Sequence, residues 1–264
     1  MWRTIVVFCC IVTKEYRVSR IPFYIGSVVT WFVPDSVRRS RVRGAINTML
    51  YTPRIKRLIK RVYHDRVTSI KFVRQINLNR FVCVANDRYY VKVFRNITLE
   101  RVREHKFLVD FVRPFVGVTI PEMHLDKNIP MYVCEKISGR PINSFDAEII
   151  LKNDGKITRQ VSDIVAQIQH IDIHSVPDYE RFWFGIQPER QPEKPVANGA
   201  NPQPVLAHFD LNETNLFFDD DMNITGVIDW DTLSIAKNPE TDMNVFDLFW
   251  GMFRQRLIRK LKKS

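Results

Sequence analysis

Residues 208–231 read HFDLNETNLFFDDDMNITGVIDWD, and this stretch decides the fold of the chain. LFF and ITGVI have the apolar composition of short strands and are separated by the polar turn DMN, so they predict a hairpin. Asn215 then lies at the entrance of the hairpin and Asp229 at its exit. We expect both side chains to converge on one point beside Asp210, which follows the strand-like run VLAHF.

The side chains beside this hairpin have the chemistry that phosphoryl transfer requires. Hard divalent cations prefer oxygen ligands, and Asn215 and Asp229 offer an amide oxygen and a carboxylate. Asp210 can then orient an attacking hydroxyl and accept its proton. Such a transfer needs neutralised phosphate oxygens and an acceptor held in line more than it needs covalent chemistry. An acid, an amide and a second acid at these intervals meet those needs.

The residues from Thr68 to Ile137 predict a small β-rich lobe. Its strand-like runs are SIKFVRQI, RFVCVAND, RYYVKVF and MYVCEKI. A helix is predicted over residues 98–112, with Thr98 as its cap. Lys92 lies on a strand and Glu104 on this helix. An ion pair between them would hold the Lys92 ammonium toward a phosphate, whereas a lysine on an alternating strand can instead face solvent.

The back half of the chain predicts helices and one irregular segment. Residues 156–175 have apolar residues at helical spacing, which indicates a core helix. His170 and His174 are four residues apart, but no third ligand of the right kind is near, so we interpret them as surface or cap residues. Residues 187–204 contain five prolines and no apolar period, which predicts a loop.

Several motifs resemble one enzyme family. HFDLNETN fits the H-x-D-x-x-x-x-N catalytic loop of kinase-fold enzymes, and VIDW stands where those enzymes keep a metal-binding Asp. With NPETDM at residues 238–243, these motifs resemble the aminoglycoside phosphotransferase and choline kinase family. Upstream, YVKV is similar to the strand lysine of the family, REHKFL to its helix glutamate, and YVCEKISGRP to its hinge. The resemblance extends over about residues 68–253.

The resemblance implies an α+β, bilobal, protein-kinase-like fold, with a small antiparallel β lobe and a larger, mainly helical lobe. It implies Asp210 as the catalytic base, and Asn215 and Asp229 as Mg²⁺ ligands. It also implies that His208 buttresses the catalytic loop and that Asp242 organises this loop from the helix behind it.

The same resemblance implies ATP as the phosphate donor. Lys92 would contact its phosphates with Glu104 as partner, and the backbone around Glu135 and Ile137 would meet the adenine. The chain departs from the family at the turn that covers the phosphates, because residues 75–80 (QINLNR) contain no glycine. Asn tolerates unusual backbone angles, so a tight turn is still compatible with this sequence.

The net charge of +11 is unevenly distributed, since residues 67–264 contain equal numbers of basic and acidic residues. We therefore divide the chain into a basic, partly apolar N-terminal extension (1–66), a nucleotide-binding lobe (67–137) and a helical catalytic lobe with a basic tail (138–264). The four cysteines form no C-x-x-C pair, which favours a reducing, cytoplasmic compartment and argues against a thiolate metal site.

The N-terminal extension has two interpretations. Its apolar runs at residues 4–12 and 21–33 are too short to span a bilayer, and the arginine clusters that follow suit a segment in the headgroup layer at the inner face of a membrane. The alternative is an arm that packs its apolar side on the body of the protein. Nucleic acid is a less favoured partner, because no zinc spacing, RNP-like pattern or helix-turn-helix signature accompanies the charge.

We therefore expect an ATP- and Mg²⁺-dependent phosphotransferase acting on a hydroxyl of a small molecule or a glycan. The basic extension favours an acceptor on an anionic carrier, such as a lipopolysaccharide core sugar. The mildly acidic residues 67–253 instead favour a cationic acceptor, such as an aminoglycoside or choline. An alternative of another class is a catalytically silent, membrane-docked binding module, which nucleotide binding without turnover would identify.

Overall fold

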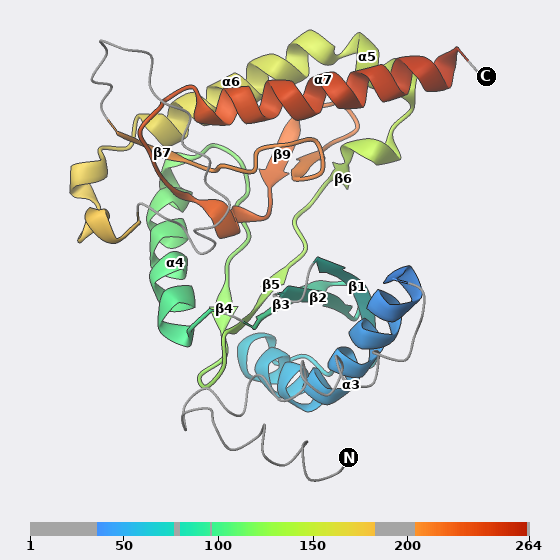
Figure 1. Cartoon of the computed structure of the whole chain (residues 1–264), viewed down its shortest axis with the longest axis vertical. Coiled ribbons are helices and arrows are strands. Elements are labelled where there is room, and N and C mark those ends of the chain that lie inside the picture. The colour runs from blue at the N-terminus through green and yellow to red at the C-terminus, as the bar shows by residue number, and fades with distance from the viewer. Residues whose placement is uncertain (1–35, 77–79, 96, 183–203, 263–264) are drawn as a thin grey trace. The chain divides into compact units, whose positions relative to one another are not determined.

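The structure is a computed structural model that describes residues 36–76, 80–95, 97–182 and 204–262. Its helices and strands are α3 (Ser36–Tyr63), β1 (Ile70–Ile76), β2 (Arg80–Ala85), β3 (Tyr89–Phe94), α4 (Leu99–Val112), β4 (His124–Leu125), β5 (Met131–Glu135), β6 (Arg140–Pro141), α5 (Ala147–Lys152), α6 (Asp154–Gln169), β7 (Val205–Ala207), β8 (Leu216–Phe218), β9 (Ile224–Val227), β10 (Ser234–Ala236) and α7 (Thr241–Leu261). Figure 1 shows these elements along the chain.

The chain folds into two compact units. The first contains the described residues up to Val102 together with Met123–Lys136, and the second contains Arg103–Glu122 and the residues from Ile137 onward. The first unit is built on a five-stranded antiparallel sheet in the order β1-β2-β3-β5-β4. The four strand-like runs of the sequence form β1, β2, β3 and β5, so the predicted β-rich lobe is confirmed.

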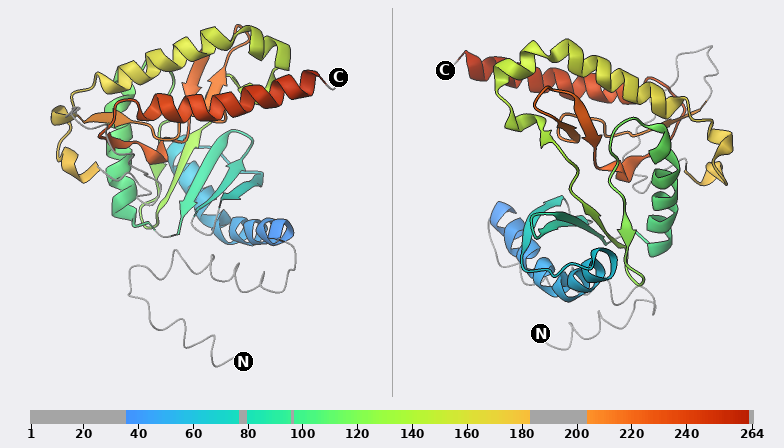
Figure 2. Two further views of the ribbon diagram at one scale, coloured as in Figure 1. Left: turned by 45° about the horizontal axis from the view of Figure 1, so that its top comes forward. Right: turned by 180° about the vertical axis from the view of Figure 1, so that it is seen from behind.

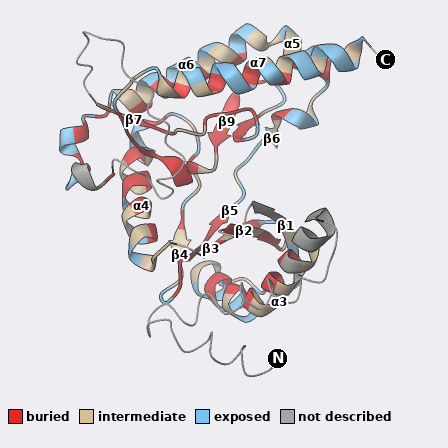
Figure 3. Cartoon of the chain, in the orientation of Figure 1, coloured by how far each residue is buried: buried red, intermediate tan, exposed pale blue. Residues whose placement is uncertain are grey.

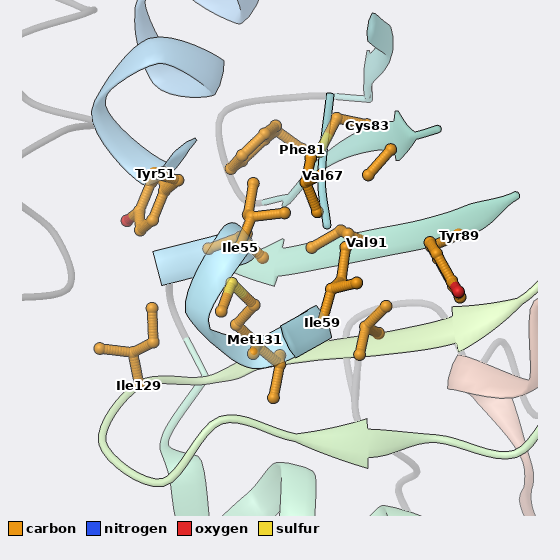
Figure 4. Packing of buried hydrophobic residues seen from close by; sticks show 14 residues of the cluster. Tyr51, Ile55, Ile59, Val67, Phe81, Cys83, Tyr89, Val91, Ile129 and Met131 are labelled. Atoms are coloured by element: carbon orange, nitrogen blue, oxygen red, sulfur yellow. The ribbon is translucent and has the colours of Figure 1, made fainter. Parts of the chain in front are cut away.

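Helix α3 packs on one face of this sheet and shares its core. Tyr51, Ile55 and Ile59 of the helix are at most 1% exposed and lie against the sheet (Figure 4). Gly44 touches the sheet through β1, since a Cβ atom at this position would lie 2.4 Å from the ring of Phe72. Both views in Figure 2 show α3 running along the sheet.

This packing divides the chain differently from the sequence-based boundary at residues 66 and 67. The helical part of the predicted extension belongs to the first unit, because its apolar side chains complete the core of the sheet. The apolar runs at residues 4–12 and 21–33 lie outside the described residues. No helix in the part of the chain that the structure describes is long and apolar enough to cross a membrane.

The second unit combines helices with short strands. Helices α6 and α7 lie side by side, and the hairpin β8–β9 forms a three-stranded sheet with β6, as Figure 1 shows. Strand β7 pairs with β10. In Figure 3 the buried residues of this unit gather on the short strands, while α7 presents many exposed residues. The predicted hairpin LFF/ITGVI is therefore confirmed, and the predicted helix over 156–175 ends at Gln169.

Candidate active site

A buried carboxylate anchors the loop that follows β7. Asp242, in the first turn of α7, is 0% exposed and accepts the backbone N–H groups of His208 at 2.8 Å and Phe209 at 2.7 Å. Burial raises the pKa of Asp242 to about 6, while the two backbone hydrogen bonds act in the opposite direction. The expectation that Asp242 organises the loop from the helix behind it agrees with these contacts.

His208 holds the loop against the end of β9. Its backbone carbonyl accepts the hydroxyl of Thr232 at 2.6 Å, and its ring packs edge-on to Trp230 with 4.6 Å between ring centroids. Its Nε2 lies 3.3 Å from the carbonyl oxygen of Ile228. His208 is 0% exposed, so it contributes to the structure of the loop.

Two asparagines fix the carboxylate of Asp210. The Asn212 amide donates to Oδ1 of Asp210 at 3.0 Å, and the Asn215 amide donates to Oδ2 at 3.2 Å. The same two amides also donate to the backbone carbonyl of Asp210, at 3.0 Å and 2.8 Å. Both carboxylate oxygens are therefore held in place, as a group that receives a proton from a positioned hydroxyl requires.

The backbone on either side of this clamp is strained. Phe209 and Asp229 both have a φ of 62°, in the left-handed region that residues with a side chain rarely adopt. Such conformations cost roughly 1–3 kcal/mol and gather at functional sites. The hydrogen bond from its backbone N–H to Asp242 holds Phe209 in this conformation. Asp229 is followed directly by the 3-10 turn Trp230–Thr232. The predicted strand ITGVIDW ends at Val227 because the chain changes direction before Asp229.

The donor set around Asn215 fits a hard divalent cation. The NH₂ group of Asn215 is directed at Asp210, so its Oδ1 atom points to the other side. The N–H of Ile228 donates to the backbone oxygen of Asn215 at 2.9 Å, which brings the neighbouring Asp229 to the same end of the hairpin. No group of three or more His, Cys, Asp and Glu side chains able to hold a metal occurs among the described residues. The predicted site is of a different kind, since one of its ligands is an amide.

The predicted nucleotide residues are distributed over both units. Lys92 lies on β3 with its ammonium 5.8 Å from the ring centroid of Tyr132. It alternates with Val91 and Val93, which face α3, so Lys92 lies on the opposite face of the sheet. Glu104 lies on α4 in the second unit, and its pairing with Lys92 stays a prediction.

The predicted hinge residues stand at the end of β5. Glu135 is the last residue of this strand and forms an ion pair with Arg88, with 2.6 Å between Nη2 and Oε1. Ile137 begins the second segment of the second unit, and its Cδ1 lies 2.4 Å from the point where a Cβ atom on Gly226 would stand. Gly226 therefore makes the room that Ile137 occupies. The glycine-free turn at residues 77–79 lies outside the described residues.

Sequence reasoning missed three residues of this site. The Asn212 amide donates a hydrogen bond to the Asp210 carboxylate. The Thr232 hydroxyl donates to the backbone carbonyl of His208, which is 24 residues earlier in the sequence. Glu213 forms an ion pair with Arg256 of α7 at 3.2 Å. Asn212 could have been found, because an Asn two residues after an Asp is a local turn signal. The other two contacts depend on the tertiary fold and leave no local pattern.

The geometry of this loop agrees with what the comparisons find. The model of the phosphotransferase enzyme family matches residues 174–237, the range that contains Asp210, Asn215 and Asp229. Within this range the chain is similar to the phosphotransferase enzyme family. No curated protein sequence matches the chain.

Solved structures of phosphotransferases share the fold of this chain. The GDP complex of aminoglycoside 2'-phosphotransferase-IIIa is 14% identical, with a TM-score of 0.56 and 83% of each chain covered. The streptomycin-ATP-APH(2")-IIa ternary complex is 15% identical, with a TM-score of 0.52 and coverage of 72% of this chain and 73% of that one. Macrolide 2'-phosphotransferase MphH from Brachybacterium faecium is 16% identical, with a TM-score of 0.51 and coverage of 74% and 77%. The predicted protein-kinase-like fold is confirmed.

Proposed function

We propose that the chain transfers the γ-phosphate of ATP to a hydroxyl group, with Mg²⁺ as cofactor and Asp210 as the catalytic base. The observation that carries this proposal is the double clamp on Asp210. Amides of Asn212 and Asn215 hold both of its carboxylate oxygens, at 3.0 Å and 3.2 Å. A carboxylate fixed in this way can align an acceptor hydroxyl and receive its proton without first reorganising.

The remaining roles follow from the same arrangement. Asn215, through Oδ1, and Asp229 would hold Mg²⁺, which when bound neutralises charge on the phosphate oxygens. Lys92 would supply a second positive charge to the phosphates, with Glu104 as its partner, and the backbone at Glu135 and Ile137 would meet the base. ATP as donor is supported by the solved complex of APH(2")-IIa with ATP, although the complex of the 2'-phosphotransferase-IIIa contains GDP.

The acceptor that we favour is a hydroxyl on an anionic carrier, such as a lipopolysaccharide core sugar. The support is the positive charge at both ends of the chain, which would attract an anionic surface. A small soluble acceptor such as an aminoglycoside is the second candidate. It is favoured by the structural neighbours, which include complexes of APH(2") enzymes with kanamycin, gentamicin and streptomycin.

Turnover of ATP against a panel of acceptors tests the proposal. The panel contains purified lipopolysaccharide, free sugars, aminoglycosides, a macrolide and choline, and each acceptor is tested with wild type and with Asp210→Asn. We expect phosphate transfer to one class of acceptor, with loss of transfer in Asp210→Asn but not in the exposed control Asp163→Asn. Binding of Mg·ATP without transfer to any acceptor would instead indicate a catalytically silent module.

A further inference from the structure

Helix α7 has an apolar surface that no described element covers. Leu248, Phe249 and Met252 are 61%, 36% and 44% exposed, although each carries a large apolar side chain. The side chains that α7 buries, Phe246, Trp250 and Phe253, lie on a different face of the helix. A helix in contact only with its own core and with water would present polar residues on this exposed face. The three exposed apolar side chains are therefore a candidate interaction surface.

The same face becomes cationic toward the end of α7. Positions 248, 252, 256 and 260 follow one another at four-residue spacing, so Arg256 and Lys260 continue the row that Leu248 and Met252 begin. Arg259 adjoins this row one turn after Arg256. We call Leu248, Phe249, Met252, Arg256, Arg259 and Lys260 the α7 stripe. No acidic residue occurs after Asp247.

We propose that the α7 stripe docks the second unit on an anionic lipid bilayer. Apolar side chains would enter the boundary between headgroups and acyl chains, while the neighbouring cations would contact anionic headgroups. Each such cation contributes on the order of 1 kcal/mol near the surface, and salt screens this attraction. A single anionic bilayer therefore complements both the apolar half and the cationic half of the α7 stripe.

A second copy of the chain is a poorer occupant of this surface. Two α7 stripes in parallel would bring the cations of one copy against the cations of the other. In an antiparallel pair along the whole stripe, the apolar half of each copy would face the cationic half of its partner. Charges buried without a counter-ion are costly, so neither arrangement complements the stripe.

The stripe lies next to the catalytic loop. Arg256 is 60% exposed and reaches Glu213, whose side chain is 8% exposed, at 3.2 Å. Glu213 stands between Asp210 and Asn215 in the sequence. A bilayer docked on the stripe would therefore lie close to the loop, where an acceptor at the membrane surface could be reached. This last consequence rests on the proposed function, whereas the docking itself does not.

Vesicle co-sedimentation of the full-length chain tests the docking. The test variant is Leu248→Ser/Phe249→Ser/Met252→Ser, and the matched control is Val73→Ser/Phe115→Ser/Ile149→Ser, which removes side chains that are 52%, 53% and 42% exposed. With vesicles that contain phosphatidylglycerol, we expect the test variant to bind at least about tenfold more weakly than wild type and the control to bind like wild type. Arg259→Gln/Lys260→Gln should reduce binding several-fold at low salt and much less at high salt.

Other outcomes would overturn the docking proposal. Unchanged vesicle binding in the serine triple variant contradicts it directly, whichever segment of the chain then binds the vesicles. If that variant instead raises KM for a soluble acceptor, the stripe lines an acceptor site. If it alters the mass of the protein in solution, the stripe is an interface between copies. Thermal unfolding of each variant confirms that it is folded, and Asp210→Asn should bind vesicles like wild type even if no acceptor is ever phosphorylated.

Discussion

The core of the first unit and the loop of residues 208–215 in the second unit are held by opposite kinds of interaction. Between α3 and the sheet, contact is apolar and shared among many side chains, such as Ile55, Phe81 and Val91. In the loop, polar contacts converge on single groups, above all on the carboxylates of Asp210 and Asp242. Apolar contact is non-directional, while hydrogen bonds impose geometry. Damage to the core should therefore reduce stability, and damage to the loop should reduce activity.

The largest expected effect separates activity from stability at Asp210. Asp210→Asn should lower kcat by roughly 10³-fold, because the acceptor hydroxyl loses its base, with little change in the melting temperature. Steady-state kinetics with the acceptor found in the panel, together with thermal unfolding, measure both quantities. A kcat within about threefold of wild type would remove Asp210 from this role.

A second prediction compares the two proposed metal ligands. Asp229→Ala should weaken the affinity for Mg·ATP more than Asn215→Ala does, because Asp229 contributes a full negative charge and Asn215 only a dipole. Titration calorimetry with and without Mg²⁺ measures the difference. Equal affinities of wild type and Asp229→Ala would show that Asp229 does not bind the metal.

In the apolar core we expect the opposite result, a loss of stability without a loss of activity. Ile55 is 0% exposed between α3 and the sheet, so Ile55→Ala should lower the free energy of unfolding by about 2–5 kcal/mol and leave kcat nearly unchanged. Val73→Ala, at a position that is 52% exposed, is the control and should change stability by at most about 0.5 kcal/mol. Chemical denaturation checks both variants. A large loss of kcat in folded Ile55→Ala would mean that the core also sets the geometry of catalysis.

The last prediction concerns the pH dependence of stability through Asp242. Burial raises its pKa in the folded protein to about 6 from an ordinary value of 3.8. The stability that this group contributes is therefore fully present below pH 3.8 and is lost as the pH rises through about 6. Compared with Asp242→Asn, wild type should gain about 3 kcal/mol between pH 7 and pH 3.8.

Denaturation of both proteins across this pH range measures that difference. A difference between wild type and Asp242→Asn that stays constant with pH would contradict the raised pKa. At neutral pH the variant should also lose activity. The N–H groups of His208 and Phe209 reach different carboxylate oxygens, so in Asp242→Asn one of them would face the amide NH₂ group, which donates and does not accept.

Local patterns were sufficient for the sheet and the hairpin. Alternating Val and Tyr in YYVKVF predict a strand whose Lys92 lies opposite the core, and the β8–β9 pair follows from two apolar runs around a polar turn. Packing of the N-terminal extension on the body was one of its two interpretations, and α3 packs in this way, but the boundary at residue 66 left this helix outside the lobe although Tyr51, Ile55 and Ile59 have helical spacing. The arginine clusters of this segment favoured the membrane-surface interpretation instead.

The candidate site was predictable only in part. The types and spacing of Asp210, Asn215 and Asp229 suggested their chemistry, because each role needs a particular functional group. The supporting contacts could not be predicted, since Thr232 meets His208 and Arg256 meets Glu213 only after the chain has folded. Removal of residues 1–66, which the sequence-based boundary suggests as a clean truncation, would delete part of the core. Removal of residues 1–35 leaves α3 whole and is the better experiment.

The left-handed backbone at Phe209 has a consequence for protein engineering. Glycine adopts this conformation without the steric cost that phenylalanine carries, so Phe209→Gly relieves strain in the folded state while it raises the conformational entropy of the unfolded chain. This gain in folded-state stability would come at the residue that immediately precedes Asp210. Greater backbone freedom there would leave the orientation of the Asp210 carboxylate less fixed. Selection for heat resistance and selection for turnover should therefore favour different residues at position 209. A library of variants at this position, screened separately for stability and for turnover, would show whether only the active variants keep a bulky side chain.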